Sequence, residues 1–387
     1  MRILFIHNAY QHRGGEDSVV DAEIDLLRSR GHFVEIYGRH NDEVAAIPRL
    51  SLASQTLWSG RTVDDVARLI NSFNPEVIHV HNTFPLISPS LYWAANRARL
   101  PIIQTLHNFR LLCPQAMFLR ESKVCEDCLG KVPWRGVVRG CYRGSPAQSL
   151  VLASMVTLHR AIGTWQNKVT RYIALNEFCR SKFIAGGLPA DRIAVKPNFV
   201  DFSAPPEVLR HGFLFVGRLS AEKGVNVLVD AVRQVSGVAV CVAGTGPEDH
   251  LLDGVAGLQP LGALSGEAVR IAMSQSAALI LPSIWYENFP RTLVEAFGCG
   301  LPVIASRIGA LAELVEDGVT GLLFEPGNAN DLAAKMQWAQ QNPEQMLQMG
   351  RNARKLYEAK YTADRNYDQL IAIYSDAIKE TARLGSQ

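Results

Sequence analysis

Short runs of apolar residues alternate with amphipathic segments along most of the chain. The first apolar runs, which are typical of buried strands, cover residues 2–6, 32–37, 76–81, 101–107 and 171–176. Between them, segments such as 15–31 repeat apolar residues at helical spacing and end on a glycine. Strands that alternate with helices predict parallel sheets whose faces are covered by helices.

A proline-rich stretch at residues 195–212 interrupts the alternation and predicts a linker. The apolar runs then resume at residues 212–217, 237–244, 277–283 and 301–306. We therefore expect an α/β protein with two doubly wound, Rossmann-like domains at residues 1–200 and 201–361, and a C-terminal helix at 362–387 that packs on the first domain. Ligands of such sheets bind beyond the carboxyl ends of the strands, so the residues that follow each strand are the candidates for chemistry.

Composition agrees with a globular protein of this size. The chain has 387 residues, and 48% of them are hydrophobic, which is enough for two cores. Its 39 Lys and Arg residues nearly balance its 37 Asp and Glu residues, so net charge does not indicate nucleic acid as a partner. The sequence shows neither a signal peptide nor an apolar run long enough for a membrane span. We therefore expect a cytoplasmic protein whose seven cysteines are thiols or metal ligands.

Two glutamates flank Pro290, shortly after the run that ends at residue 283. Proline is favoured in the first turn of a helix, so we predict a helix capped by Asn288 or Phe289. The first-turn amides, which lack partners within a helix and attract an anion, then belong to Arg291, Thr292 and Leu293. Glu287 and Glu295 would repel a bound diphosphate, but they suit a nucleotide sugar if they accept hydrogen bonds from sugar and ribose hydroxyls.

Two cations follow the apolar run at 212–217. Arg218 and Lys223 are placed to offset the charge of a diphosphate, and the sequence has no Asp-x-Asp pair of the kind that holds a catalytic cation on a nucleotide sugar. Taken singly, these cations and Glu295 are also consistent with ordinary solvated surface charges.

These motifs resemble those of the family-4 retaining glycosyltransferases, which have the GT-B architecture of two facing Rossmann-like domains with a cleft between them. The resemblance rests on the segments 7–37, 105–109, 216–224, 242–248, 282–306 and 308–333. It implies transfer of a sugar from a nucleoside-diphosphate sugar with retention of anomeric configuration, and no cofactor required for catalysis.

The resemblance also implies roles for residues on the donor side. Glu287, with the amides of Asn288 and Phe289, would contact the hydroxyls of the donor sugar, and Glu295 would hold the ribose. The oxygen of the leaving diphosphate would itself accept the proton of the acceptor hydroxyl. Catalysis would then consist mainly of positioning and of stabilising the departing charge.

The same resemblance assigns Arg218 and Lys223 to the leaving group.

Gly244 belongs to a Gly-Thr-Gly segment that lacks the third glycine of a dinucleotide fingerprint, so we interpret it as a turn on the donor side. A dehydrogenase is disfavoured for a related reason, because the first strand is not followed by Gly-x-Gly-x-x-Gly.

In the N-terminal half, Gly14 and Gly15 lie between a strand and a helix, where a bare backbone can approach phosphate or simply make a turn.

His107 aligns with a family histidine near the transferred sugar. Asn108 follows it where many relatives have Asp, so a positional role for His107 is favoured over proton transfer.

Two further histidines alternate on the strand at 76–81. We expect His79 to pack in the core, whereas His81 near the strand end either packs or faces the cleft. Together with the adjacent Asn82, His81 is a candidate for the acceptor side.

An unusual stretch at 109–145 contains four cysteines. Cys125 and Cys128 form a Cys-x2-Cys pair, which is flanked by Cys113 and Cys141. Four thiolates in a loop of this length suit a structural zinc ion, with buried or reactive thiols as the alternative. Such a zinc would be structural, since four thiolates leave no open position for substrate.

The same stretch carries basic residues interleaved with aromatic ones. Lys131, Trp134, Arg135 and Arg139 precede an amphipathic segment. A solvated basic face is one interpretation, and an anionic lipid surface or a lipid-linked acceptor is the other.

The sequence thus predicts a retaining glycosyltransferase that moves a hexose-type sugar to a glycan or lipid-linked acceptor in bacterial polysaccharide or glycolipid synthesis. It would act in the cytoplasm, with possible peripheral contact at the inner face of the membrane. The alternatives are a nucleotide-sugar epimerase on the same fold and a catalytically silent subunit that binds a nucleotide sugar.

Overall fold

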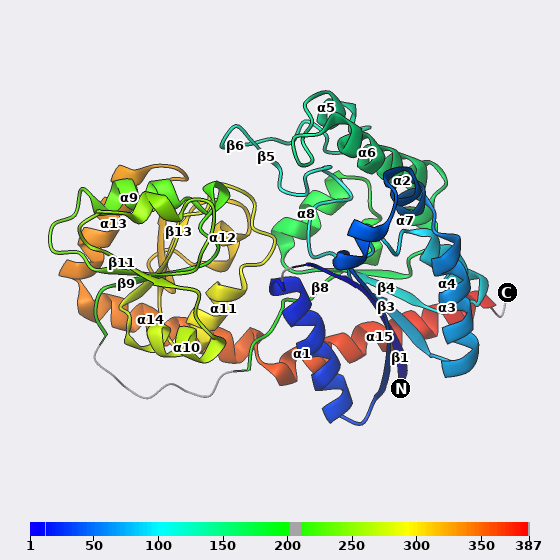
Figure 1. Ribbon diagram of the computed structural model, residues 1–387. Coiled ribbons are helices and arrows are strands. Elements are labelled where there is room, and N and C mark those ends of the chain that lie inside the picture. The colour runs from blue at the N-terminus through cyan, green and yellow to red at the C-terminus, as the bar shows by residue number, and fades with distance from the viewer. Residues whose placement is uncertain (12, 202–209, 386–387) are drawn as a thin grey trace. The chain divides into compact units, whose positions relative to one another are not determined.

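The computed structural model describes residues 1–11, 13–201 and 210–385, and the chain divides into two compact units (Figure 1). The first unit comprises residues 1–117, 126–197 and 366–387, and the second comprises 118–125 and 198–365. The predicted linker lies partly at 202–209, outside the described residues. The insertion expected within the N-terminal domain is divided, because residues 118–125 belong to the second unit.

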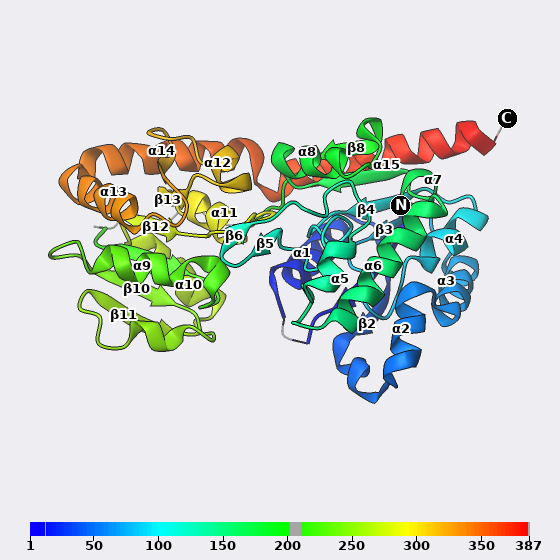
Figure 2. The same ribbon diagram turned by 90° about the horizontal axis from the view of Figure 1, so that it is seen from above.

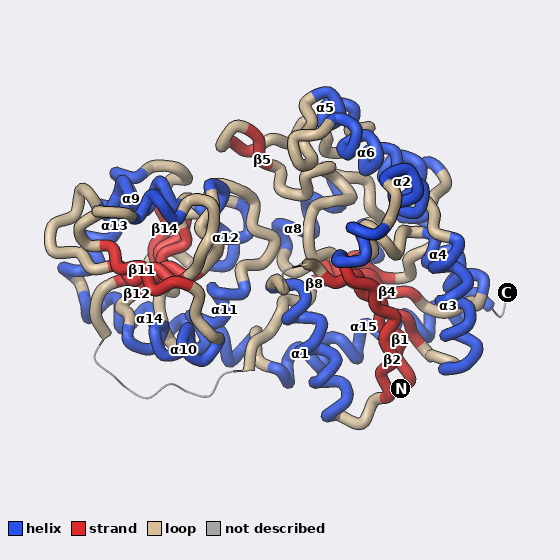
Figure 3. Tube along the Cα trace, in the orientation of Figure 1, coloured by secondary structure: helices blue, strands red, loops and turns tan. Residues whose placement is uncertain are grey.

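The first unit is built on a six-stranded parallel sheet in the order β2-β1-β3-β4-β7-β8. Its strands are β1 (Arg2–Ala9), β2 (Phe33–His40), β3 (Val77–Val80), β4 (Ile102–Thr105), β7 (Arg171–Ala174) and β8 (Ile193–Val195). The strands β3 and β4 are buried along their whole length, as expected of central strands between two layers of helices. Figure 3 shows helices on both sides of these strands.

The helices of the first unit follow the predicted alternation. They are α1 (Gly15–Ser29), η1 (Asn41–Ala46), α2 (Arg49–Leu57), α3 (Gly60–Phe73), α4 (Ser90–Arg97), α5 (Trp134–Val138), α6 (Pro146–Ala161), α7 (Thr164–Asn167), α8 (Glu177–Ala185), η2 (Ala190–Arg192) and α15 (Ala363–Gly385). In α15, Leu370, Tyr374 and Ala377 are fully buried in one core with Ile3 and Phe5 of β1, which places this last helix on the first sheet.

The second unit repeats the design with the strand order β11-β10-β9-β12-β13-β14, again all parallel. Its strands are β9 (Phe213–Val216), β10 (Val240–Ala243), β11 (Leu258–Gly262), β12 (Ala278–Leu281), β13 (Val303–Ser306) and β14 (Gly321–Phe324). Its helices are η3 (Ala221–Lys223), α9 (Val225–Val232), η4 (Asp249–Leu252), α10 (Gly266–Gln275), α11 (Arg291–Gly298), α12 (Gly309–Leu314), α13 (Ala329–Gln341) and α14 (Pro343–Lys360). The predicted fold class, two doubly wound parallel sheets, is therefore confirmed.

The divided insertion adds small elements to both units. In the second unit, β5 (Leu119–Arg120) pairs antiparallel with β6 (Lys123–Val124). In the first unit, α5 lies beside α6 in both Figure 1 and Figure 2. Ser145 caps α6 by accepting a hydrogen bond from the Gln148 amide, and Pro146 opens its first turn.

Candidate functional site

Glu287 lies in the loop between β12 and α11, and three donors converge on one of its oxygens. Its Oε1 lies 2.6 Å from Lys223 Nζ and accepts hydrogen bonds from Ser283 Oγ at 2.8 Å and from Trp285 Nε1 at 3.2 Å. Glu287 is 6% exposed. Its Oε2 accepts no hydrogen bond from any residue that the structure describes, so this oxygen is available to a ligand hydroxyl.

Lys223 reaches Glu287 because the loop after β9 folds tightly. Gly224, which follows it, has a φ of +74°, and a Cβ there would lie 1.9 Å from the Pro282 carbonyl oxygen. Only glycine fits this approach of the two loops. Since β9 and β12 are neighbours in the sheet, the loops at their carboxyl ends bring together two residues that the sequence singled out.

Arg218, the second predicted cation, lies two residues after β9 and is exposed. Within the described part of the chain it forms neither an ion pair nor a side-chain hydrogen bond. Gly244 has a backbone conformation and a close contact that exclude a side chain. Its φ is +143°, and a Cβ would lie 1.9 Å from the Gly217 carbonyl oxygen. This glycine lets the loops after β9 and β10 pack closely, which is consistent with the predicted turn.

The start of α11 differs from the sequence-based prediction. The helix begins at Arg291, and the cap position is taken by Pro290, so the prediction of Asn288 or Phe289 as the cap is wrong. The Leu293 amide donates to the Pro290 carbonyl at 3.1 Å, and the Leu293 side chain is fully buried, so it does not offer a free group to an anion. The first-turn amides of Arg291 and Thr292 remain as candidates.

Glu295 lies one turn into α11 and is paired with Arg291. The Arg291 Nε lies 2.8 Å from Glu295 Oε1. Burial raises the pKa of the Glu295 carboxyl, and the Arg291 guanidinium opposes that shift. The two predicted glutamates are thus held by different cations, Glu287 by Lys223 and Glu295 by Arg291. Asn288 is buried beside them and Phe289 is half-buried.

In the first unit, Asp17 organises the turn that contains Gly14 and Gly15. It accepts a hydrogen bond from the Gly14 amide at 2.8 Å and lies 2.8 Å from His7 Nε2. A Cβ at Gly15 would meet no heavy atom within 4 Å, so the turn is open at this residue. Sequence reasoning missed Asp17; its position three residues after the cap of α1 is the signal that identifies it.

Glu16, beside Asp17, was also missed. Tyr10 donates its hydroxyl hydrogen to Glu16 Oε2 at 2.9 Å, and a hydrogen bond from the Asn108 side chain also favours the ionised carboxylate. Burial, reinforced by Asp17 nearby, raises the pKa of Glu16 to about 7. A carboxyl that titrates near neutral pH is suited to proton transfer or to an acceptor hydroxyl.

The predicted histidines come together at the carboxyl ends of β3 and β4. His81 Nδ1 lies 2.7 Å from His107 Nε2, and the two rings stack at 5.0 Å. His79 packs in the core as expected, with hydrogen bonds to Tyr374 and Thr105. Burial lowers the pKa of the half-buried His107 to about 3, which keeps its imidazole neutral.

Both the nitrogen and the oxygen of the Asn82 side-chain amide form hydrogen bonds with the backbone. Its Nδ2 donates to the Asn8 carbonyl at 2.8 Å, and its Oδ1 accepts from the Phe84 amide at 3.0 Å. Both contacts fix the turn after β3, and a role for Asn82 on the acceptor side stays a prediction.

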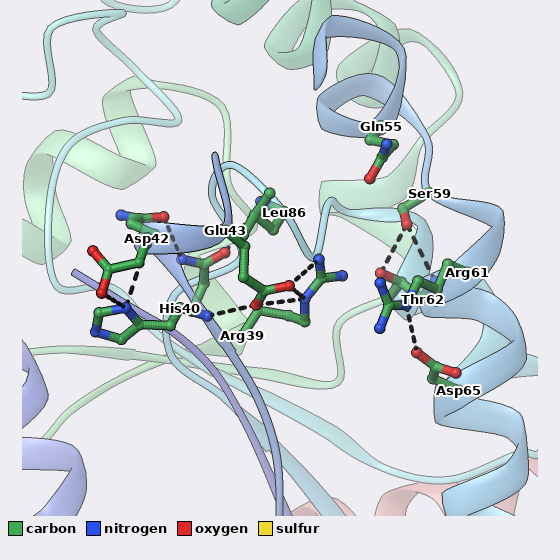
Figure 4. Close-up of polar contacts among 12 residues, drawn as sticks. Arg39, His40, Asp42, Glu43, Gln55, Ser59, Arg61, Thr62, Asp65 and Leu86 are labelled. Carbon is green, nitrogen blue, oxygen red and sulfur yellow. Dashed lines mark hydrogen bonds and ion pairs between the residues drawn. The ribbon is translucent and has the colours of Figure 1, made fainter. Parts of the chain in front are cut away.

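A second polar cluster lies at the carboxyl end of β2 and was not singled out from the sequence (Figure 4). The buried Arg39 holds Glu43 through Nε at 2.9 Å and Nη2 at 2.7 Å. This pairing lowers the pKa of Glu43 to about 2. On the neighbouring helix α3, Arg61 lies 3.5 Å from Asp65. Both pairs join residues four positions apart, so each one stabilises its own stretch of chain.

Among the four cysteines of the insertion, Cys128 is buried, whereas Cys113, Cys125 and Cys141 are partly buried. Cys125 ends the segment that belongs to the second unit, whereas the other three belong to the first. Gly136 packs against Pro114, and the Cys141 amide donates to the Gly136 carbonyl, so the neighbourhoods of Cys113 and Cys141 adjoin. A zinc ion held by the four thiolates stays a prediction from their spacing.

The basic residues of the insertion are partly neutralised. Arg139 Nη1 lies 2.5 Å and Arg135 Nη1 lies 3.5 Å from the carboxylate of Asp127. Lys131 is exposed, and Trp134 and Val138 of α5 are 58% and 72% exposed. This surface therefore combines apolar side chains with cations, although two of its arginines share one carboxylate.

Comparison with known proteins gives two family matches. The model "Glycosyltransferase Family 4" matches residues 13–204, and "Glycosyl transferases group 1" matches residues 210–356. Among relatives, the phosphatidyl-myo-inositol mannosyltransferase of Mycobacterium leprae is 26% identical over 358 residues, which are 83% of this chain and 82% of that protein. The alpha-D-kanosaminyltransferase of Streptomyces kanamyceticus is 29% identical over 42% of this chain, and the match spans only 45% of that protein's length.

Solved structures agree on the fold. HepE from Anabaena in complex with UDP superposes with a TM-score of 0.70 at 19% identity, covering 97% of this chain and all of that one. Sucrose-phosphate synthase from Thermosynechococcus elongatus gives a TM-score of 0.72 at 19% identity, covering 98% and 99% of the two chains. Among the described residues, no helix combines the length and the apolar character needed to span a bilayer. With a family match on each half and this fold, the chain belongs to the group 1 and family 4 glycosyltransferases of the GT-B fold.

Proposed function

We propose that this protein is a retaining glycosyltransferase that moves a hexose-type sugar from a nucleoside-diphosphate sugar to a glycan or lipid-linked acceptor. One observation carries the proposal: Lys223 and Glu287, from loops after two adjacent strands, lie 2.6 Å apart. A cation and a carboxylate placed together at the carboxyl end of a parallel sheet suit a ligand that has both a diphosphate and sugar hydroxyls.

In this mechanism the donor competes for both members of the pair. Lys223 turns from Glu287 to the diphosphate, where Arg218 adds a second positive charge, so that protein cations stabilise the leaving group without a required metal. Glu287 keeps its hydrogen bonds from Ser283 and Trp285. Its Oε2 then accepts hydrogen bonds from the donor sugar.

The remaining donor contacts come from α11. Arg291 and Thr292 offer first-turn amides to phosphate oxygens. Glu295 accepts hydrogen bonds from the ribose, for which its carboxyl must be ionised. The departing diphosphate oxygen takes the proton of the acceptor hydroxyl as the new glycosidic bond forms on the same face of the sugar. Catalysis on this scheme depends on positioning more than on a general base.

UDP is the first nucleotide to test because HepE was solved with UDP. Thermal unfolding should be measured with UDP, GDP, ADP and dTDP, each in large excess. A ligand at about a hundred times its dissociation constant stabilises the folded state by roughly 2.7 kcal/mol, which gives a visible shift. A shift with one nucleotide supports the donor site. No shift with any of the four contradicts the proposal.

The acceptor is proposed to be membrane-associated. Trp134 and Val138 expose apolar surface beside Lys131, a combination that suits an anionic lipid surface. The mannosyltransferase relative is named for phosphatidyl-myo-inositol, a lipid. The protein would therefore work in the cytoplasm, in peripheral contact with the inner face of the membrane.

A further inference from the structure

A fully buried ion pair lies behind the histidines of the first unit. Lys196, which follows β8, is 0% exposed, and its Nζ lies 2.5 Å from Glu23 Oε1 of α1. The same ammonium donates to Asn366 Oδ1 at 3.2 Å. Burying two charges is costly unless each has a partner, and removal of one member would leave the other charge buried alone. No part of the proposed donor site uses this ion pair.

A metal ion is the first use to consider. Ligand atoms of Glu23, His79 and His81 all lie within 4.8 Å of one another. However, Glu23 already binds the Lys196 ammonium, and both ring nitrogens of His79 have protein partners, Tyr374 at 2.7 Å and Thr105 at 2.8 Å. An ammonium beside the ligands and two occupied imidazole nitrogens do not fit a cation.

The contact between His81 and His107 indicates a different role for the buried ion pair. Two imidazole nitrogens 2.7 Å apart share one hydrogen, so one ring donates and the other accepts. Burial lowers the pKa of His81 well below its ordinary value, with further lowering by His79, His107, His7 and Lys196. Both rings are therefore neutral, and each carries a single proton on one nitrogen.

Glu23 decides where the proton of His81 lies. Its Oε2 is 3.7 Å from His81 Nε2, and neither atom has another partner among the described residues. A lone pair on Nε2 would face the carboxylate, whereas an N–H at Nε2 would point its positive end at it. The proton consequently belongs on Nε2, and Nδ1 is left as an acceptor.

We propose that Glu23, held by Lys196, fixes the tautomer of His107 through His81. His107 then donates its Nε2–H to His81 and presents Nδ1 as a hydrogen-bond acceptor at the end of β4. The Nδ1 atom of the half-buried His107 would accept a hydrogen bond from a hydroxyl group, such as that of a sugar. A phosphate oxygen without a hydrogen could not donate to it. The use of this nitrogen for a sugar rests on the proposed function, whereas the tautomer itself does not.

The next residue supports this arrangement. Asn108 has no carboxylate to orient the imidazole, and its Oδ1 accepts a hydrogen bond from the Arg110 amide at 3.1 Å, within its own loop. Glu23 therefore supplies, through His81, the carboxylate that residue 108 lacks. In this role Glu23, Lys196 and His81 are positioning residues for His107.

The test is the imidazole ¹⁵N spectrum of the full chain labelled with ¹⁵N-histidine, with His107 assigned by its loss in His107→Gln. In the wild type, we expect both His81 and His107 to carry their proton on Nε2. The double variant Glu23→Leu/Lys196→Met removes both buried charges together, and its His107 signals should shift to a mixture of tautomers. Asp25→Asn, an exposed carboxylate on the same helix, is the matched control and should retain the wild-type spectrum.

Two results would overturn the inference: a wild-type His107 that carries its proton on Nδ1, or a double variant whose tautomers match the wild type. The first does not need the double variant, so the test survives if that variant does not fold. UDP titration of the wild type distinguishes a failure of the proposed function from a failure of the tautomer assignment. Absence of UDP binding in the presence of the expected tautomers would count against the proposed function and leave the histidine arrangement intact.

Discussion

Lys223 Nζ and Glu287 Oε1 lie 2.6 Å apart although 64 residues separate them in the sequence. Each residue neutralises the other before a donor binds. On the proposed function, the pair holds a cation for the diphosphate and a carboxylate for the sugar without leaving either charge exposed alone. Donor binding would then exchange one ion pair for another, which limits the cost of desolvation.

Replacing Glu287 with Gln tests this exchange. The amide keeps the shape but releases Lys223, so we expect UDP affinity to stay equal or to rise, while turnover of the UDP-sugar falls by roughly a hundredfold. Calorimetric titration with UDP and the rate of UDP release from the donor measure the two effects. Asp230→Asn, an exposed carboxylate on α9, should change neither. Equal losses in affinity and turnover would contradict the assigned role.

Glu295→Ala should weaken nucleotide binding by about tenfold or more, since a hydrogen bond to a charged group is worth about 1.5–3 kcal/mol. Because burial raises the pKa of Glu295, the ionised form needed for the ribose is lost at a higher pH than for an exposed glutamate. Affinity should therefore fall as the pH drops through that raised pKa. Glu295→Gln should lack this component of the pH dependence, and an unchanged pH profile would remove the ribose assignment.

Glu16 should make the stability of the first unit depend on pH near neutrality. Its folded pKa of about 7 lies above the ordinary value of 4.5, so its favourable contribution is fully present below pH 4.5 and is lost as the pH rises through 7. The complete change is about 3 kcal/mol at most. Glu16→Gln should consequently be more stable than the wild type at pH 8 and equal to it at pH 4 in urea unfolding.

The exposed Glu35 of β2 provides the control for that experiment. Because the Glu35 side chain is exposed to solvent, the stability of Glu35→Gln relative to the wild type should be the same at both values of pH. A Glu16→Gln variant that behaves like Glu35→Gln would show that Glu16 is ionised in the folded protein at neutral pH.

Zinc analysis of the purified, untagged protein tests the cysteine prediction. We expect about one zinc ion per chain, because four thiolates in this spacing complete a tetrahedral site. Cys125→Ser and Cys128→Ser should each lose the metal, and Cys241→Ser, a thiol of β10, should retain it. If zinc persisted in Cys125→Ser, the predicted four-thiolate site would be wrong and the cysteines would be ordinary thiols.

Membrane contact can be tested by co-sedimentation with vesicles that contain anionic lipid. The wild type should bind in a salt-sensitive manner, and Trp134→Ser/Val138→Ser should bind several-fold more weakly because both apolar side chains are lost from the interface. Phe33→Ser removes an exposed aromatic ring from β2 and should bind like the wild type. Equal binding of all three proteins would exclude α5 as the contact surface.

Much of the fold could be predicted from the sequence because its signals are local. The apolar runs of β1, β3, β4, β9, β10, β12 and β13 are flanked by helical periodicity, and that alternation is enough to predict parallel sheets. The edge strand β11 was missed because Pro260 and polar neighbours interrupt it, which an edge position tolerates. The short strands β8 and β14 were missed as well.

At the candidate site, the sequence by itself determined which residue types follow which strands, and so it singled out Lys223, Glu287 and His107. Only the tertiary structure decided their partners. Glu23 and Lys196 are 173 residues apart, and nothing in either local pattern indicates that they share a buried site. The strand order of the sheet and the packing of α1 bring them together, since a charge is tolerated in a core only beside its partner.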